Sequence, residues 1–138
     1  MALIKRFEGC RLDAYLCPAG VWTIGWGSTG PGIRNGTRWT QGQADERLAQ
    51  DVDKFLSGVR SRITRQVTES ELGAMTSLAY NIGLDAFGKS TLLRLFNEGK
   101  KDLAAKQFDV WRRAGGRVLD GLVKRRTAER RVFEGGAG

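Results

Sequence analysis

Apolar residues recur every three or four positions through most of the chain after residue 40, a spacing typical of amphipathic α-helices. The longest such stripe predicts a helix over about 40–63, which begins with a capping box formed by Thr40 and Gln43. A second capping box, at Thr68 and Glu71, begins the most apolar helix, which we expect at the centre of a helical lobe. The stripe of the first helix consists of Ala44, Leu48, Val52, Phe55, Leu56, Val59 and Ile63.

Shorter apolar runs predict further helices towards the C-terminus. Ser90 or Thr91 caps one, Asp102 caps another, and Gly115-Gly116 interrupts the chain before a final helix. The apolar face of that last helix is formed by Leu119, Leu122, Val123 and Phe133.

The first 40 residues have a different pattern. A short helix over residues 2–8 carries Glu8 at its end, and Gly9 stops it. Between residues 12 and 29, short apolar and aromatic segments alternate with proline and glycine, which predicts a small antiparallel sheet with its first turn at 17–20.

These elements together predict an α+β protein, mainly helical, with a small antiparallel sheet in an N-terminal lobe. We expect one domain over residues 1–138. Its small lobe spans about 9–40 and its helical lobe about 64–138, and the helix over about 40–63 links them. The helix at 2–8 belongs to the helical lobe.

Composition narrows the range of functions. The net charge of +8 suits a polyanionic partner such as nucleic acid, anionic lipid or an acidic cell wall, although a role in solubility alone is the simpler explanation. No apolar run approaches the roughly 18 residues that a membrane-spanning helix needs. No secretory signal is visible either. We therefore expect either export by another route or an N-terminal segment that is missing here.

Histidine is absent, which excludes serine and cysteine nucleophile systems that depend on it and any histidine metal site. We expect no metal and no cofactor. The two cysteines, Cys10 and Cys17, could form a disulfide in an oxidising compartment, but two free thiols are an equally good interpretation.

An arginine falls within the apolar stripe of the final helix. On a helical wheel, Arg126 lies among the apolar positions, and a buried arginine requires a carboxylate partner. Either Arg126 turns outward or pairs locally with Glu129, or Arg125 or Arg126 pairs with a carboxylate between the lobes, for which Glu8 is the natural candidate.

The stretch from Glu8 to Thr29 concentrates the candidate chemistry. A glutamate in a semi-apolar cleft can act as a general acid, and Thr23 and Cys17 can hold a water opposite it, which is an arrangement for hydrolysing a glycosidic bond. Residue types alone favour a simpler explanation, in which these are surface, core and strand residues.

The same stretch resembles the catalytic pattern of the phage-type, T4-lysozyme-like muramidases: Glu, eight residues, Asp or Cys, five residues, Thr. Glu8, Cys17 and Thr23 match it. Segments that also read as family sequence are I-K-R-F-E-G at 4–9, A-Y-L-C-P-A-G at 14–20, W-T-I-G-W-G at 22–27, A-Y-N-I-G at 79–83, S-T-L-L at 90–93, W-R-R-A-G-G-R-V-L at 111–119 and G-L-V-K-R-R at 121–126.

The resemblance implies a two-lobed lysozyme that cleaves the β-1,4 bond between N-acetylmuramic acid and N-acetylglucosamine in peptidoglycan. Glu8 would protonate the leaving oxygen, while Cys17 and Thr23 position or activate the water. By the same resemblance, the residues lining the sugar groove would be Gly27, Thr29, Tyr80 and Ser90.

The partners implied are peptidoglycan and the anionic bacterial envelope, with no specific nucleic acid. We expect a monomer made in the host cytoplasm, which acts on peptidoglycan after release to the periplasm.

Two features of this stretch depart from the family pattern or vary within it. Ser28 stands where relatives usually have a histidine that helps to tie the lobes through a carboxylate, which puts that tie in doubt. Cys17 is a poorer base than an aspartate near neutral pH, which favours direct water attack with inversion and leaves a covalent cysteine intermediate open. A disulfide between Cys10 and Cys17 would hold the enzyme inactive until it is reduced.

Two alternative functions remain open. A lytic transglycosylase needs one glutamate but no held water. A non-catalytic module that binds nucleic acid or the envelope would use the positive charge and the basic final helix, although no recognised nucleic-acid motif is present.

Overall fold

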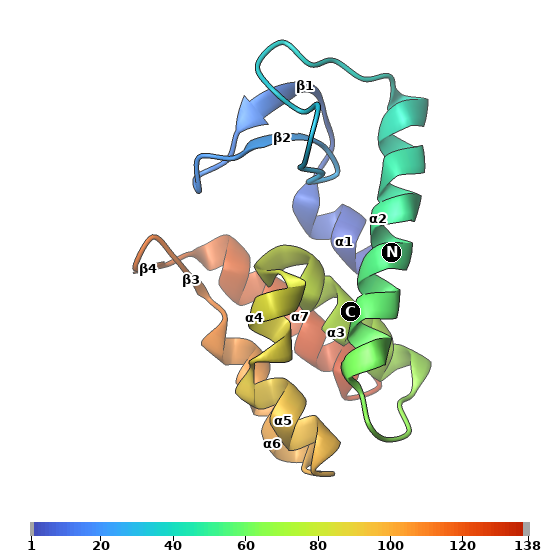
Figure 1. Ribbon diagram of the computed structural model, residues 1–138. Coiled ribbons are helices and arrows are strands. Elements are labelled where there is room, and N and C mark those ends of the chain that lie inside the picture. The colour runs from blue at the N-terminus through green and yellow to red at the C-terminus, as the bar shows by residue number, and fades with distance from the viewer. Residues whose placement is uncertain (1, 137–138) are drawn as a thin grey trace.

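The computed structural model describes residues 2–136 and has two lobes beside a long helix, α2 (Figure 1). The small lobe contains β1 (Arg11–Leu16), β2 (Trp22–Gly25) and the loop that leads into α2 (Gln41–Arg62). The short helix α1 (Ala2–Glu8) lies between this lobe and the helical lobe. The remaining elements are α3 (Glu69–Ile82), α4 (Leu84–Gly88), α5 (Thr91–Asn97), α6 (Lys101–Gln107), a 3-10 turn (Phe108–Val110), β3 (Arg113–Ala114), β4 (Arg117–Val118) and α7 (Asp120–Phe133).

The predicted helix starts are confirmed at three positions. The Thr40 hydroxyl accepts from the backbone N–H of Gln43 at 3.1 Å, and the Gln43 side chain accepts from the Thr40 N–H at 2.8 Å. Thr68 and Glu71 form the same reciprocal box on α3, and the Ser90 hydroxyl caps α5. The cap predicted at Asp102 is wrong: α6 begins at Lys101, and Asp102 lies inside its first turn, where a negative charge favours the helix dipole.

The core of the helical lobe forms around α3, as its apolar sequence predicts. α3 packs against α2 on one side and α7 on the other. Aromatic rings fill the space beyond it, and Phe108 and Phe133 lie 5.3 Å apart between ring centroids. The largest fully buried apolar side chains of this lobe are Met75, Leu78, Phe87, Leu92, Phe96 and Phe108.

The approach to the last helix differs from the sequence prediction. Gly115 and Gly116, with φ of 59° and 77°, form the turn of a β-hairpin that joins β3 to β4. This hairpin was not predicted, because two-residue strands leave no periodic pattern. Leu119 and Val123 remain exposed, so the predicted apolar face of α7 is wrong at its start. The side chains that α7 buries are Arg125, Arg126, Ala128, Glu129 and Phe133.

The predicted small sheet is confirmed as an antiparallel pair. Tyr15 faces Thr23 and Leu16 faces Trp22 across the two strands, with an irregularity nearer Arg11. The Cys17 N–H donates to the Val21 carbonyl at 3.0 Å, so the turn closes directly after β1.

Candidate active site

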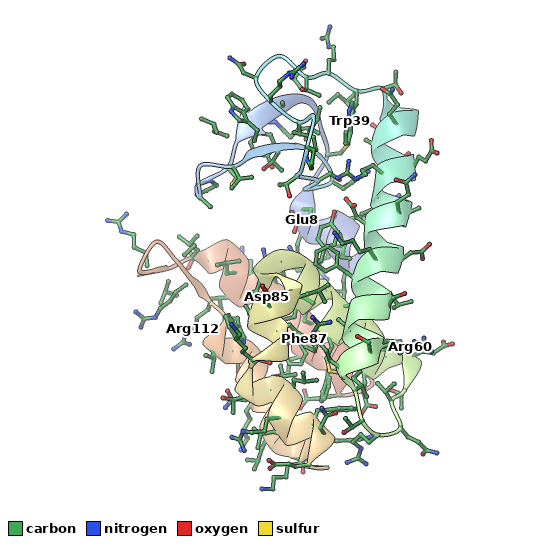
Figure 2. All side chains as sticks on the ribbon, in the orientation of Figure 1. Glu8, Trp39, Arg60, Asp85, Phe87 and Arg112 are labelled. Carbon is green, nitrogen blue, oxygen red and sulfur yellow. The ribbon has the colours of Figure 1, made fainter. Side chains whose placement is uncertain are left out.

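Glu8 lies at the end of α1, between the two lobes (Figure 2). Gly9 follows with φ of 67°, a left-handed conformation that ends the helix directly after the glutamate. The Glu8 side chain is 18% exposed, so the carboxylate is reachable but largely enclosed by protein. The glutamate proposed from the sequence as the general acid therefore lies, partly enclosed, at the junction of the two lobes.

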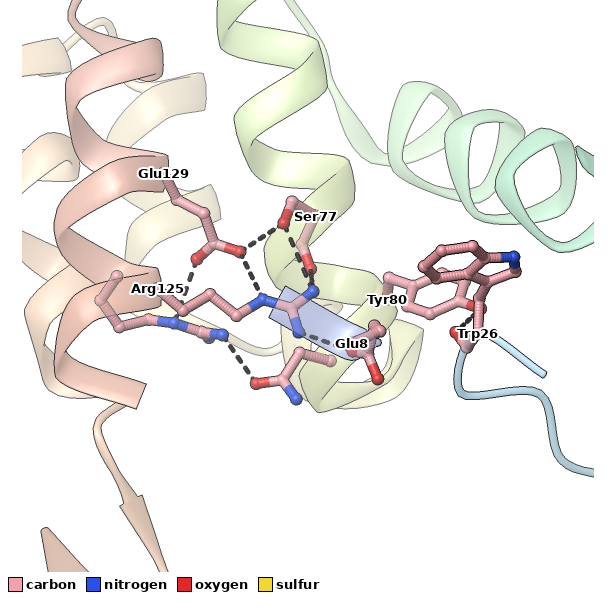
Figure 3. A network of polar contacts seen from close by, with 8 residues as sticks. Glu8, Trp26, Ser77, Tyr80, Arg125 and Glu129 are labelled. Atoms are coloured by element: carbon pink, nitrogen blue, oxygen red, sulfur yellow. Dashed lines mark hydrogen bonds and ion pairs between the residues drawn. The ribbon is translucent and has the colours of Figure 1, made fainter. Parts of the chain in front are cut away.

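Arg125 of α7 contacts this carboxylate directly (Figure 3). Its Nη1 lies 2.5 Å from Glu8 Oε2, and the arginine side chain is only 4% exposed. Its Nη2 donates to the Ser77 carbonyl at 3.1 Å and its Nε donates to Glu129 at 3.2 Å. Of the two arginines proposed as partners of Glu8, the structure pairs Arg125 with it.

Arg126 points into the protein beside this pair. It is fully buried, with its Nε 3.0 Å from Glu129 Oε1, and its Nη2 donates to Asn81 Oδ1 at 2.7 Å. Burial lowers the pKa of Arg126 to about 10, so the guanidinium keeps its charge near neutral pH. The local partner that the sequence offered, Glu129, is therefore the partner of Arg126.

The small lobe contacts Glu8 through a glycine. Gly27 has φ of 90°, and a Cβ placed there would lie 2.5 Å from Glu8 Oε1 and 3.5 Å from the Tyr80 ring. The Tyr80 hydroxyl donates to the Trp26 carbonyl at 2.8 Å, which joins α3 to the same loop. Burial raises the pKa of Tyr80, and the negative charges of Asp51 and Glu8 add to this effect, so the phenol stays a hydrogen-bond donor.

Cys17 and Thr23 lie on one face of the hairpin. Thr23 is opposite Tyr15, and Cys17 is two residues beyond Tyr15, so all three side chains share a face. Burial raises the pKa of Tyr15, and the negative charge of Glu8 adds to the rise, so Tyr15 lies within electrostatic range of Glu8. Tyr15 is not among the predicted site residues, although its alternation with Cys17 along the chain is a signal for it.

The thiol of Cys17 ionises more readily than an ordinary cysteine. Desolvation alone would raise its pKa, but hydrogen bonds from the backbone at Val21 and Ala19 and from the Thr23 hydroxyl lower it overall. The same hydroxyl also lies 3.0 Å from the Val21 carbonyl. Its single proton serves one of these acceptors at a time, and its lone pairs stay available to a water.

Three of the four predicted groove residues come together. A pocket of about 140 Å³ is lined by Gly27, Thr29 and Tyr80. The sequence analysis missed the residues of α2 on its other side, which are Arg47, Asp51, Lys54 and Phe55. Ser90 does not join them as a free polar group: it is buried, and its hydroxyl donates to the Phe87 carbonyl at 2.6 Å while capping α5.

The tie that was in doubt at Ser28 is present in another form. The Ser28 hydroxyl donates to Asp51 Oδ2 at 2.7 Å, and Arg47 Nε approaches Asp51 Oδ1 at 3.0 Å. Arg47 also donates to the Thr29 carbonyl at 2.7 Å. A serine and an arginine therefore hold the small-lobe loop to the carboxylate of α2.

A disulfide between Cys10 and Cys17 is incompatible with this fold, so that hypothesis is wrong for the folded protein. The two residues flank β1, and a strand rises about 3.3 Å per residue, which separates them by roughly 20 Å. A disulfide requires Cα atoms within about 7 Å. Both thiols are free.

No group of three histidine, cysteine, aspartate or glutamate side chains within residues 2–136 could hold a metal ion. The side chains of Glu8, Cys17 and Thr23 supply a carboxyl group, a thiol and a hydroxyl. That set suits general acid catalysis with a positioned water.

Known proteins resemble this chain over most of its length. The endolysin of Acyrthosiphon pisum secondary endosymbiont phage 1 is 41% identical over 138 aligned residues, which cover 97% of this chain and 94% of that protein. The endolysin of Bacillus phage PZA is also 41% identical, but the match spans only 53% of its length, so the chain is about half as long as that relative.

Solved structures show the same fold. The muramidase domain of SpmX from Asticaccaulis excentricus superposes with a TM-score of 0.86 at 38% identity, covering 96% of this chain and 92% of that one. A point mutant of P22 lysozyme superposes with a TM-score of 0.79 at 34% identity over 96% of this chain and 93% of its own. The family model described as phage lysozyme matches residues 5–129. The chain therefore belongs to the phage lysozyme family.

Proposed function

We propose that this protein is a peptidoglycan hydrolase that cleaves the β-1,4 bond between N-acetylmuramic acid and N-acetylglucosamine. Membership of the phage lysozyme family and the muramidase fold of a structural neighbour support the class of reaction. The observation that carries the proposal is Glu8 itself, because Arg125 holds one of its oxygens while the other faces Gly27 beside the pocket.

In this proposal Glu8 is the general acid that protonates the leaving oxygen. Water attacks from the hairpin side, held and oriented by Thr23 and Cys17. The lowered pKa of the Cys17 thiol raises its share of thiolate, which can accept a hydrogen bond from the water. The route we propose is direct water attack with inversion. A covalent cysteine intermediate would instead retain the anomeric configuration, so the product anomer separates the two routes.

The pocket lined by Gly27, Thr29 and Tyr80 would hold part of the sugar chain. The net charge of +8 favours approach to an anionic envelope. No helix within residues 2–136 is long and apolar enough to cross a bilayer. We propose that the protein acts as a monomer, is made in the host cytoplasm and reaches peptidoglycan after release to the periplasm.

The test compares wild type with Glu8→Gln and with Glu46→Gln, an exposed glutamate of α2 that serves as the matched control. Turbidity loss of chloroform-treated bacteria is measured, and circular dichroism checks the fold. Glu8→Gln should lose at least about 1000-fold in rate, because the acid that protonates the leaving group is gone. Glu46→Gln should equal wild type.

Analysis of the products completes this test. A new reducing end supports hydrolysis, and a 1,6-anhydro end would make the protein a lytic transglycosylase. Wild-type activity in a folded Glu8→Gln would overturn the proposal.

A further inference from the structure

The contact between Arg125 and Glu8 creates a requirement that the catalytic proposal does not meet by itself. A general acid must carry a proton, and a guanidinium nitrogen of Arg125 lies 2.5 Å from a carboxyl oxygen of Glu8, so its positive charge acts directly on the proposed acid. Arg126 adds a second buried positive charge close behind Arg125. The proposed acid therefore needs a negative charge near this pair to offset the two positive charges.

Glu129 lies where such a charge is needed. Its side chain is fully buried, and its Oε2 accepts from the Ser77 hydroxyl at 2.5 Å and from Arg125 Nε at 3.2 Å. Its Oε1 lies 3.0 Å from Arg126 Nε. Arg125 is therefore shared between two carboxylates, Glu129 on one side of its guanidinium and Glu8 on the other (Figure 3).

The charges around this site come from four elements. From α7 come Arg125, Arg126 and Glu129. Tyr80 of α3 and Tyr15 of β1 face Glu8 as neutral phenols, because burial raises the pKa of each.

Asp51 of α2, which also acts on Tyr80, is already paired with Arg47. Burial raises the pKa of Glu129 overall, and its contacts with Arg126, Ser77 and Arg125 limit that rise. The ion pair itself rests on geometry, because guanidinium nitrogens lie 3.2 Å and 3.0 Å from its two oxygens.

We propose that Glu129, anchored by Ser77, is a positioning residue that fixes the orientation of Arg125 and offsets its charge, so that Glu8 can carry the catalytic proton. The inference rests on the proposed role of Glu8 as general acid. Glu129 itself does not touch the substrate in this scheme, because it is fully buried behind Arg125.

The inference predicts opposite effects from two neutralising substitutions. Glu129→Gln removes the offsetting charge, so Glu8 ionises more readily, and the alkaline limb of the pH–activity profile should move down by about 1 pH unit. Arg126→Gln removes one positive charge and leaves Glu129 facing Arg125 alone, so the same limb should move to higher pH. A merely structural contribution would lower the rate or the stability without shifting the limb in opposite directions.

The experiment measures pH–activity profiles of wild type and both variants between about pH 4 and 9, using soluble peptidoglycan fragments. Carbon-13 NMR of the Glu8 carboxyl group over the same range gives its titration midpoint without any need for activity. Glu46→Gln and Arg130→Gln, on exposed and half-exposed positions, are the charge-matched controls and should leave both readouts at the wild-type values. Glu129→Asp keeps the negative charge, so it should shift the alkaline limb less than Glu129→Gln does.

If Glu129→Gln does not fold, Arg126→Gln and Ser77→Ala carry the test. Ser77→Ala keeps every charge but removes the anchor of Glu129, and it should shift the limb down by less than Glu129→Gln. Unchanged limbs and midpoints in the folded variants would overturn the inference. Failure of the catalytic proposal is recognised separately, because Glu8→Gln would then keep its activity whatever the NMR titrations show.

Discussion

The two sides of the candidate active site hold their polar groups by different means. On the hairpin side, Cys17 and Thr23 are six residues apart and are positioned by backbone pairing between β1 and β2. On the helical side, Glu8 and Arg125 are 117 residues apart and are positioned by buried charges. Local backbone geometry tolerates change in single side chains, whereas a buried charge left without its partner costs several kcal/mol, about 3–5.

The two sides also contribute differently to the site: the hairpin sets the positions of polar groups, and the helical side sets the charges around Glu8. The hairpin brings a thiol and a hydroxyl to one place with few demands on the rest of the chain. The helical side adds to Glu8 an electrostatic environment that depends on three more ionisable side chains. Gly27 and Tyr80 connect the two sides. Gly27, in the small-lobe loop, lies against Glu8 and Tyr80, and the Tyr80 hydroxyl of α3 donates to the Trp26 carbonyl of the same loop.

Among substitutions that leave Glu8 itself unchanged, the largest effect is expected at Gly27, where the two sides touch. Gly27→Ala places a methyl group 2.5 Å from Glu8 Oε1, which displaces the acid, and we expect a loss of about 100-fold in kcat. The strain of an alanine at φ of 90° adds about 1–2 kcal/mol of destabilisation. Steady-state kinetics and urea unfolding measure both.

Gly32→Ala is the matched control for this comparison. Gly32 has a similar φ of 85°, but no atom lies within 4 Å of its added Cβ. It should lose similar stability and keep wild-type activity. Equal loss of activity in both variants would show that strain in the small lobe, and not contact with Glu8, limits catalysis.

A smaller effect is expected where the loop is tied to α2. Ser28→Ala removes the donor to Asp51 and leaves a largely enclosed carboxylate oxygen without it, which should cost about 1–2 kcal/mol of unfolding free energy. Ser61→Ala, an exposed serine of α2, is the control and should be near neutral. A Ser28→Ala protein as stable as wild type would mean that Arg47 alone holds this tie.

Glu71 and Glu129 are both buried glutamates of the helical lobe, but the pKa of Glu71 is lowered while that of Glu129 is raised. Burial alone would raise the pKa of Glu71, but hydrogen bonds from Thr68 and the charge of Lys101, 2.9 Å away, lower it overall. A lowered folded pKa contributes stability that is present above the ordinary value of 4.5 and is lost as the pH falls through the folded value.

Glu71→Gln should therefore cost about 1 kcal/mol at pH 7, and the cost should shrink below the ordinary value of its carboxyl group. Thermal unfolding at about pH 7 and about pH 3 measures this, with exposed Glu69→Gln as the control. A cost that stays constant over this range would show that the ionised form of Glu71 contributes nothing.

The smallest effect is expected at Cys10, which directly precedes β1. Cys10→Ser should leave activity unchanged with and without reductant, because β1 separates Cys10 from Cys17. Cys17→Ser provides the contrast and should lower activity in both conditions. Activity of wild type that rises with reductant, and stays high in Cys10→Ser, would show that β1 rearranges.

The helices, the small sheet and the position of Glu8 could be predicted because each depends on local pattern. Capping boxes at Thr40 and Thr68 fixed two helix starts, since their side chains bond to backbone only three residues away. The hydrogen-bonded cap at Ser90 was also predictable, but its consequence for the groove was not, because burial depends on what packs above it.

The charge network could be predicted only in part. The wheel position of Arg126 indicated a buried arginine, yet Arg125 pairs with Glu8, because adjacent helix positions point about 100° apart and the tilt of α7 decides which one faces α1. The role of Ser77 could not be predicted at all, since it depends on how α3 and α7 bring together two residues 52 positions apart.

The hairpin between β3 and β4 offers a practical use for the fold. Every residue from Arg112 to Gly121 is exposed, and the strands at its tip pair only with each other. A foreign segment inserted between Gly115 and Gly116 would therefore extend into solvent without entering the core. Binding modules or fluorescent labels can be attached at this point, on a part of the surface that contributes no residue to the proposed catalytic group.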